Sequence, residues 1–158
     1  MKAFRFFIAF LMMVVSNKIE AQSDSSKIFR KAKGTLAFPI SNVSKIETYE
    51  QAINKIWEEQ PIKRTTFISD SICDAEAIFG GVVLTVKEID SSYVLITKFG
   101  DYFITYFGLL KPNLFKGDFI KKGQFLSAVQ KDFDNKYRLE IYLSTPKEDI
   151  DPFPWFTK

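Results

Sequence analysis

The chain has 158 residues, of which 46% are hydrophobic and 16% aromatic, and it carries a formal net charge of +3. This length suffices for one domain with a hydrophobic core. The sequence contains no histidine, which excludes Ser-His-Asp and Cys-His catalysis and any zinc site built on imidazole ligands. Its one cysteine, Cys73, excludes an intramolecular disulfide.

The first 22 residues have the pattern of a secretory signal peptide: Lys2 and Arg5 precede an apolar stretch, and the small residue Ala21 follows it. The apolar stretch falls short of the ~20 residues that span a bilayer, so a membrane anchor is the less favoured alternative. We expect export to the periplasm or the extracellular space, with no stable membrane anchor after cleavage. Cleavage would remove three basic residues and one acidic residue, which leaves a net charge of +1 and gives no support for nucleic-acid binding.

Residues 23–33 are polar and lack periodicity, so they are expected to be a tether that precedes a domain over 34–158. A short strand is predicted over 34–40. Between about 44 and 58, apolar residues recur at helical spacing after a possible N-cap at Ser44, which predicts one amphipathic helix. Its apolar stripe is more typical of core packing than of a groove for a partner.

After Pro61 the hydrophobic pattern has a period of two, which is the signal of β-strands. Strands are predicted over 77–89, 92–98, 102–107, 125–130 and 137–143, separated by turn sequences such as Asp90-Ser91-Ser92 and Gly100-Asp101. Because helices do not alternate with these strands, the fold class is mainly β, with an antiparallel sheet connected by hairpins. The closing segment 153–156 is expected to pin the C-terminus onto the sheet through its aromatic residues.

Several short motifs occur along these strands in a fixed order: Ala77–Val83, Tyr93–Ile96, Phe99–Gly100, Thr105–Leu109, Gly117–Gln124, Leu139–Ile141, and Asp151–Pro152 followed by Trp155. Together they resemble the β-sheet core of the lysostaphin-like (LytM-type) peptidoglycan endopeptidases, a duplicated-hybrid-motif fold. The stretch Lys33–Pro39 is similar to the start of that domain in EnvC-like murein hydrolase activators. Singly each motif is weak, since the Gly117–Gln124 phrase is also found in lipoyl-like carrier domains.

Active members of the family hold zinc with a His-x-x-x-Asp pair and the second histidine of a His-x-His, and two further histidines assist the chemistry. The resemblance places these positions at Lys63 and Phe67, at Gly108 in the Tyr-x-His phrase, and at Lys136 and Arg138. None of these residues ligates zinc in its ordinary protonation state. The resemblance therefore implies a pseudoenzyme with no metal and no other cofactor.

Lys136, Arg138, Glu140 and Tyr142 alternate along one predicted strand and should share one face of it. With Lys63 nearby, this face could form a groove that binds carboxylates, with Arg138 as the bidentate contact. The alternative is a solvent-exposed face whose charges protect the sheet from aggregation.

The sequence thus predicts a catalytically inactive peptidase-like domain that regulates, activates or scaffolds cell-wall hydrolases in the bacterial envelope. The expected partner is a cell-wall amidase or another envelope protein, with peptidoglycan itself as a further ligand. The alternatives are a residual peptidoglycan metalloendopeptidase, a wall-binding module, and a carrier domain modified at Lys131.

Overall fold

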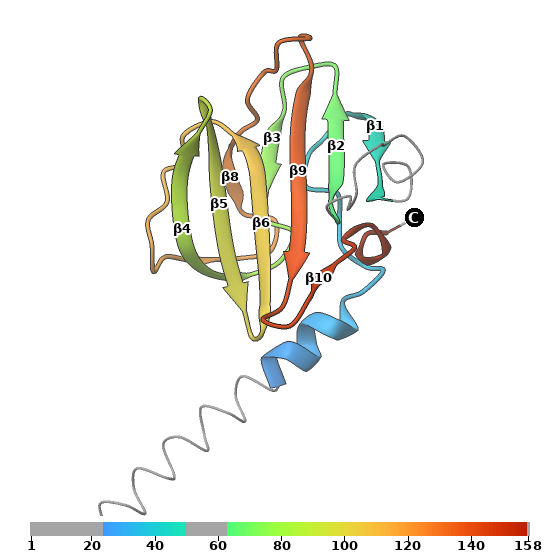
Figure 1. Cartoon of the computed structure of the whole chain (residues 1–158), viewed down its shortest axis with the longest axis vertical. Helices are drawn as coiled ribbons and strands as arrows, with labels where there is room; N and C mark the ends of the chain where they lie inside the picture. The colour runs from blue at the N-terminus through green and yellow to red at the C-terminus, as the bar shows by residue number, and fades with distance from the viewer. Residues whose placement is uncertain (1–23, 50–62, 158) are drawn as a thin grey trace, which may run out of the picture.

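Antiparallel strands are the main secondary structure in a computed structural model that describes residues 24–49 and 63–157 (Figure 1). The expected signal peptide lies outside the described residues. Within them, no helix is long and apolar enough to cross a membrane.

The main sheet is antiparallel throughout, with the strand order β1-β2-β9-β6-β5-β4-β7 and with β10 paired to β9 (Figure 1). Its strands are β1 (Val43–Glu47), β2 (Thr65–Ser69), β4 (Gly81–Ile89), β5 (Ser92–Phe99), β6 (Tyr102–Leu109), β7 (Phe119–Ile120), β9 (Tyr137–Ser144) and β10 (Asp149–Ile150). A second sheet pairs β3 (Asp74–Glu76) with β8 (Phe125–Ala128), and a 3₁₀ turn, η1, spans Phe153–Trp155. The mainly β, antiparallel fold class is confirmed.

Two tight turns connect the central hairpins where the sequence predicts them. Asp90 and Ser91 link β4 to β5 with φ values of 50° and 64°, as a two-residue turn that matches the twist of a hairpin requires. Gly100 starts the turn between β5 and β6 with φ 59°, and a Cβ there would meet the Oγ of Ser26 at 2.6 Å.

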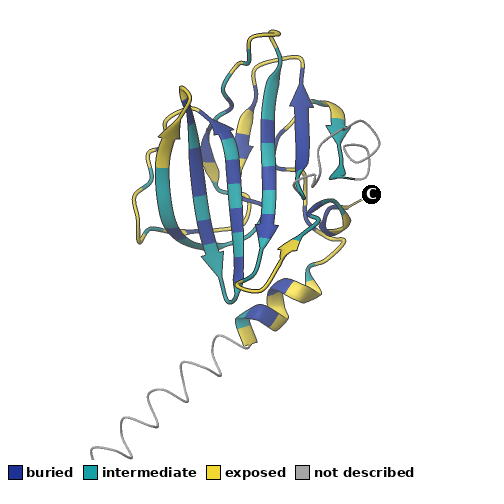
Figure 2. Cartoon of the chain, viewed as in Figure 1, coloured by how far each residue is buried: buried dark blue, intermediate teal, exposed yellow. Residues whose placement is uncertain are grey.

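The main sheet has two different faces. On β5, β6 and β9 the buried side chains alternate with partly exposed ones (Figure 2). The inner face, which includes Leu95, Ile104, Tyr106, Leu139 and Ile141, packs into the core with β3 and β8. We call the opposite side, which includes Val94, Phe103 and Phe107, the outer face.

The N-terminal residues 24–31 are helical, so the prediction of an irregular tether over 23–33 is wrong for this stretch. Phe29 is fully buried, and its ring stacks on Trp155 with the centroids 4.6 Å apart. Ser26 is also buried; its hydroxyl donates to Asp101 and accepts from the Asp101 amide. One buried phenylalanine in a polar segment produces no detectable periodicity, which explains the error.

The C-terminal segment closes onto the same region, as the sequence predicts. Trp155 and Phe156 are buried, and Phe156 forms a bridge with Leu36. The predicted strand over 34–40 is reduced to that bridge and to one between Ile40 and Ala75.

The helix expected over 44–58 does not begin where the sequence predicts. Val43–Glu47 is a strand, and its residues from Lys45 to Glu47 pair in register with β2. Ile46 packs against the core from this strand, so tertiary pairing overrides the local helical pattern. The rest of the predicted helix lies outside the described residues.

Candidate functional site

The outer face of the sheet is hollowed on both sides of Phe107. One hollow, of about 340 Å³, lies over β6 and β9 and is lined by residues that include Thr105, Tyr142 and Lys63. The second, of about 310 Å³, lies toward the β4–β5 turn and is lined by residues that include Gly108, Arg138 and Glu140. Because Phe107 lines both hollows, we describe them together as the outer groove.

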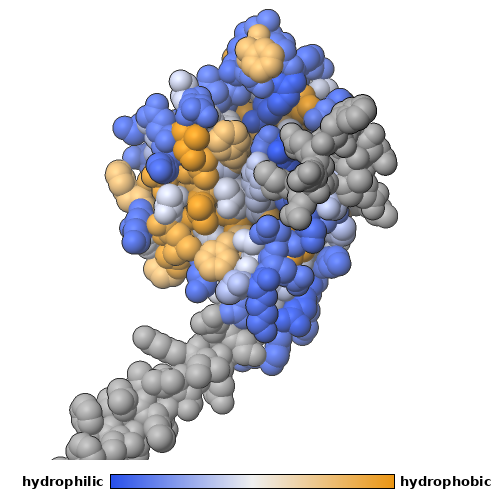
Figure 3. Space-filling view, in the orientation of Figure 1, coloured by the Kyte–Doolittle hydropathy of each residue, from blue (hydrophilic) through white to orange (hydrophobic). Residues whose placement is uncertain are grey.

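Strand register explains the composition of this groove. Phe107 stands directly opposite Val94 on β5 and Glu140 on β9. One row further, Thr105 stands between Ile96 and Tyr142. Directly opposite residues share a face, so apolar and polar side chains come together here. In Figure 3 hydrophobic residues cover the outer face over β4 to β6, and hydrophilic residues surround them.

Arg138, at the start of β9, is held by two carboxylates of the loop that precedes this strand. Its Nη1 donates to Oδ2 of Asp132 at 2.8 Å and to Oδ1 of Asp134 at 2.6 Å, and its Nη2 also bonds Asp134. The hydrogen bond from Arg138 lowers the pKa of Asp134 to about 2, and Asp134 in turn raises the pKa of Arg138. The guanidinium thus makes its bidentate contact with Asp134 of the same chain, and not with the carboxylate of a ligand as the sequence predicts.

Lys136 and Lys63 are engaged elsewhere. Lys136 forms an ion pair with Asp70, and this hydrogen bond lowers the pKa of Asp70. Lys63 donates to the main-chain oxygen of Asp149 at 3.0 Å, in the hollow that Arg138 does not line. The structure therefore does not bring these cations together into one carboxylate-binding site.

Glu140 and Tyr142 do interact, as neighbours on one face should. The Tyr142 hydroxyl donates to Glu140, and Nε of Arg64 lies 3.6 Å from the same carboxylate. Burial, followed by the hydrogen bond to Glu140, raises the pKa of Tyr142 to about 12. Tyr142 therefore stays protonated at neutral pH and is no general base.

Phe67 lies on the other side of the sheet. It stands opposite Leu139, is fully buried, and makes ring contacts with Phe38 and Phe156. Its neighbour Ile68 is the residue opposite Arg138. The position that the resemblance assigns to the aspartate ligand thus faces the core, away from Arg138.

Gly108 leaves no space for a side chain. Its φ is 102°, in the range that glycine tolerates best, and a Cβ there would lie 2.2 Å from the main-chain oxygen of Arg138. A histidine at this position would clash with backbone that cannot rotate away.

Sequence reasoning missed the role of Asp132 and Asp134, which bind Arg138 beside the groove. The two aspartates precede Arg138 by six and four residues in a turn sequence. This short spacing is the feature of the sequence from which their ion pairs with Arg138 could have been predicted. Over residues 24–49 and 63–157, no three histidine, cysteine, aspartate or glutamate side chains are grouped to hold a metal ion. The residues that the resemblance places at the zinc positions, Lys63, Phe67 and Arg138, are not the side chains that bind this metal.

No model of a protein family matches the sequence, and no curated protein shows significant similarity to it. Solved structures do resemble the fold. Csd3 of Helicobacter pylori superposes with a TM-score of 0.59 at 16% identity, over 78% of this chain and 35% of the Csd3 chain, so the chain spans about a third of that protein.

Two other similarities concern shorter chains. A chain of the SpoIIQ–SpoIIIAH pore-forming complex has a TM-score of 0.63 at 14% identity, over 80% of this chain and 93% of that one. The solution structure of lysostaphin has a TM-score of 0.55 at 18% identity, over 75% of this chain and 53% of lysostaphin. The chain thus shares the fold of these structures, lysostaphin among them, and this is the fold that its ordered motifs predicted.

Proposed function

We propose that this chain is a catalytically inactive LytM-like domain that regulates or scaffolds cell-wall hydrolases in the bacterial envelope. The observation that supports the proposal is the close approach of Gly108 to Arg138, because main-chain atoms fill the space at the position that the resemblance assigns to a histidine. A mere loss of ligands could be reversed by substitution, whereas this backbone arrangement has no space for a catalytic side chain.

The Arg138 ion pairs support the same conclusion. In the family a metal ion would join strands and loops at this place; here the guanidinium bonds Asp132 and Asp134 and ties their loop to β9. The positive charge at this place is thus the guanidinium of Arg138, a side chain of the protein itself. Unlike a metal ion, it has no open coordination position for water. Activation of a water molecule by a metal would need such a position.

The outer groove is the surface that we assign to the partner. Its floor at Phe107 is apolar, and two of its charged residues, Glu140 and Arg138, already form ion pairs within the domain. Such a surface suits a polypeptide with apolar side chains better than a strongly charged ligand. The similarity to a chain of the SpoIIQ–SpoIIIAH complex supports a role in protein–protein assembly.

The test is the release of dye from labelled peptidoglycan by a cell-wall amidase of the same organism, with and without the purified domain. The amidase should be stimulated, and Phe107→Ser should reduce the stimulation by about tenfold, a typical loss for a central apolar contact. Ile72→Ser is the matched control, because Ile72 is 75% exposed and lines neither hollow. Absence of stimulation would rule out an activator.

A wall-binding module is the second candidate, and the open hollow beside Thr105, Tyr142 and Ser144 favours it because hydroxyl groups there could bind sugars or peptides. Sedimentation with purified peptidoglycan separates the two functions. Binding that Phe107→Ser abolishes, without any stimulation of the amidase, would establish the module instead of the activator.

A further inference from the structure

Three phenylalanine side chains between positions 115 and 125 project into solvent: Phe119 lies in β7, which pairs with β4, Phe115 lies shortly before it, and Phe125 begins β8. Phe115 is 70% exposed, Phe119 is 82% exposed and Phe125 is 58% exposed. Phenylalanine is usually among the more buried residues, so three exposed rings within eleven residues call for a physical reason. The segment 115–125, which we name the Phe-Lys margin, also contains Lys116, Lys121 and Lys122.

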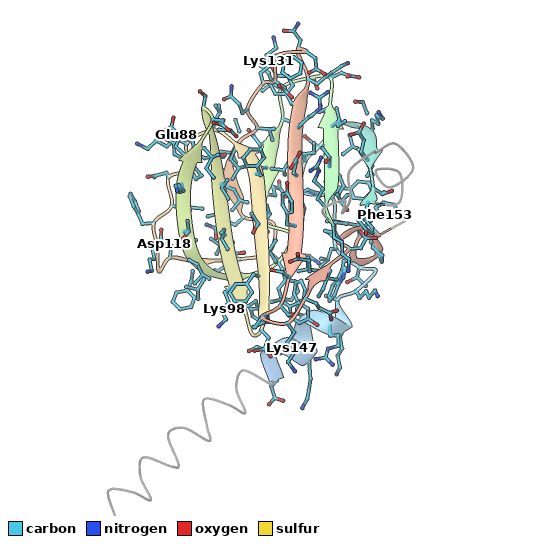
Figure 4. The ribbon with its side chains drawn as sticks, in the orientation of Figure 1. Glu88, Lys98, Asp118, Lys131, Lys147 and Phe153 are labelled. Atoms are coloured by element: carbon cyan, nitrogen blue, oxygen red, sulfur yellow. The ribbon has the colours of Figure 1, made fainter. Side chains whose placement is uncertain are left out.

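Main-chain hydrogen bonds fix this margin to the body of the domain. The Gly117 amide donates to Val83 O, and the Val83 amide donates to Asp118 O, both at 2.8 Å. At the other end, the Gly123 amide donates to Ala77 O and the Ala77 amide donates to Gln124 O. In Figure 4 the segment at Asp118 lies at the edge of the sheet, outside β4. The exposed rings are therefore held in place by the fold and do not result from a frayed loop.

The charge of the margin is positive. Lys116, Lys121 and Lys122 form no ion pair with any described residue. One carboxylate lies within the margin, that of Asp118, and it accepts a hydrogen bond from the Phe115 amide. One more, Glu76, stands opposite Phe125 across the β3–β8 pair. Three ammonium groups that have no ion-pair partner in the described part of the chain thus accompany the three rings.

Phe133 provides a comparison within the same chain. It is 95% exposed but lies between Asp132 and Asp134, whose carboxylates bind Arg138. Lys131 lies two residues away and lines the same hollow as Phe133, but the immediate neighbours of Phe133 are both acidic. The margin differs in that it combines three exposed rings with three lysines and one aspartate.

We propose that the Phe-Lys margin is a reversible contact site for an anionic lipid bilayer. Aromatic rings are favoured at the boundary between headgroups and acyl chains, and lysine ammonium groups are attracted to anionic headgroups. The rings are separated by lysines along the chain, which suits a fluid interface that needs no complementary shape. The proposal concerns another surface than the outer groove and does not rest on the proposed function.

The test is flotation with lipid vesicles, performed on the chain from Gln22 onward so that the apolar N-terminal stretch does not contribute. This part contains the whole described core, which begins at Phe29. We expect binding to vesicles made of equal parts phosphatidylglycerol and phosphatidylcholine, little binding to pure phosphatidylcholine, and weaker binding as salt is added. Equal binding to both vesicles, or to neither, would overturn the proposal.

Two matched pairs of variants locate the contact. Replacing Phe115, Phe119 and Phe125 together by serine should weaken binding at least about tenfold, while Phe133→Ser should leave it unchanged. The double variant Lys121→Glu with Lys122→Glu should lose binding, unlike the control Lys33→Glu with Lys147→Glu, which changes the net charge equally at other exposed positions. Unfolding midpoints in urea verify that each variant folds.

Equal losses in the test and control variants would mean that overall charge or hydrophobicity is responsible, and this would contradict the assignment. If the margin variants bound vesicles normally but failed to stimulate the amidase, the lipid assignment would be wrong and the margin would belong to a protein partner. If they lost only vesicle binding, the lipid contact and the regulatory function would be separate properties.

Discussion

The Cβ position of Gly108 would lie 2.2 Å from the main-chain oxygen of Arg138. This contact joins β6 to the start of β9 more closely than any side chain at position 108 would permit. Since both positions correspond to histidines in the resemblance to active peptidases, one backbone approach changes two sites of the family's zinc centre. The relationship leads directly to a test of stability.

Gly108→Ala should destabilise the domain by about 3 kcal/mol or more, because a methyl group meets backbone at a φ that disfavours alanine. Gly117→Ala is the matched control: its φ is 97°, but no atom lies within 4 Å of the added Cβ, so only strain of about 1–2 kcal/mol remains. Urea unfolding measures both. Equal losses would mean that the close approach is not a constraint.

Introducing the missing histidines should not create a zinc site. The double variant Lys136→His with Arg138→His places imidazoles at the start of β9, but Phe67 faces the core and Lys63 lines the hollow that Arg138 does not, so too few ligands converge. Metal analysis after dialysis against zinc should show no stoichiometric ion. One equivalent of bound zinc would show that the ligand positions are still able to converge.

The loop closed by Arg138 should respond to pH. The hydrogen bond from Arg138 holds the pKa of Asp134 at about 2, below its ordinary value of 3.8. A carboxyl group with a depressed pKa stabilises the folded loop above its ordinary pKa, and this contribution is lost as the pH falls through the folded value. Hydrogen exchange at the Asn135 amide, which donates to Asp132 O, should therefore accelerate between about pH 4 and pH 2 relative to the exchange of an unprotected amide at the same pH.

Arg138→Ala is the control for this pH effect. Without the guanidinium, the Asn135 amide should exchange faster already at neutral pH, and the acid-dependent acceleration should be smaller. An unchanged pH profile in Arg138→Ala would assign the transition to other carboxylates.

Phe29→Ala should cost about 3–5 kcal/mol of unfolding free energy, because its fully buried ring packs between Trp155, Tyr102 and Phe79. The adjacent Ile28 is 55% exposed, and Ile28→Ala should change stability by less than about 0.5 kcal/mol. Thermal or urea unfolding distinguishes the two. Similar small effects would restore the interpretation of this segment as a tether.

The long strands were predictable because one of their faces is buried and the other is not. In β6 the burial alternates regularly from Tyr102 to Phe107, which is the pattern that the sequence shows. In β2 all five residues are buried, so Thr65–Ser69 has no alternation and was not predicted. β3, β7 and β10 have only two or three residues each, too few for any periodicity.

The site was only partly predictable, for related reasons. Alternation correctly placed Arg138, Glu140 and Tyr142 on one face of a strand, because register depends on local geometry. It could not show that Asp132 and Asp134 reach back to Arg138, since loop conformation depends on the Asn135 turn with φ 65°. For Phe67, a displacement of one residue decides which face of the sheet the side chain occupies.

The most direct measurement of the central claim is dye release from labelled peptidoglycan by the purified domain alone, with zinc supplied in excess and then with a chelator. The account predicts no release above the buffer background under either condition, since no described residues converge on a metal. Zinc-dependent release that the chelator abolishes, and that persists after repeated purification, would contradict it.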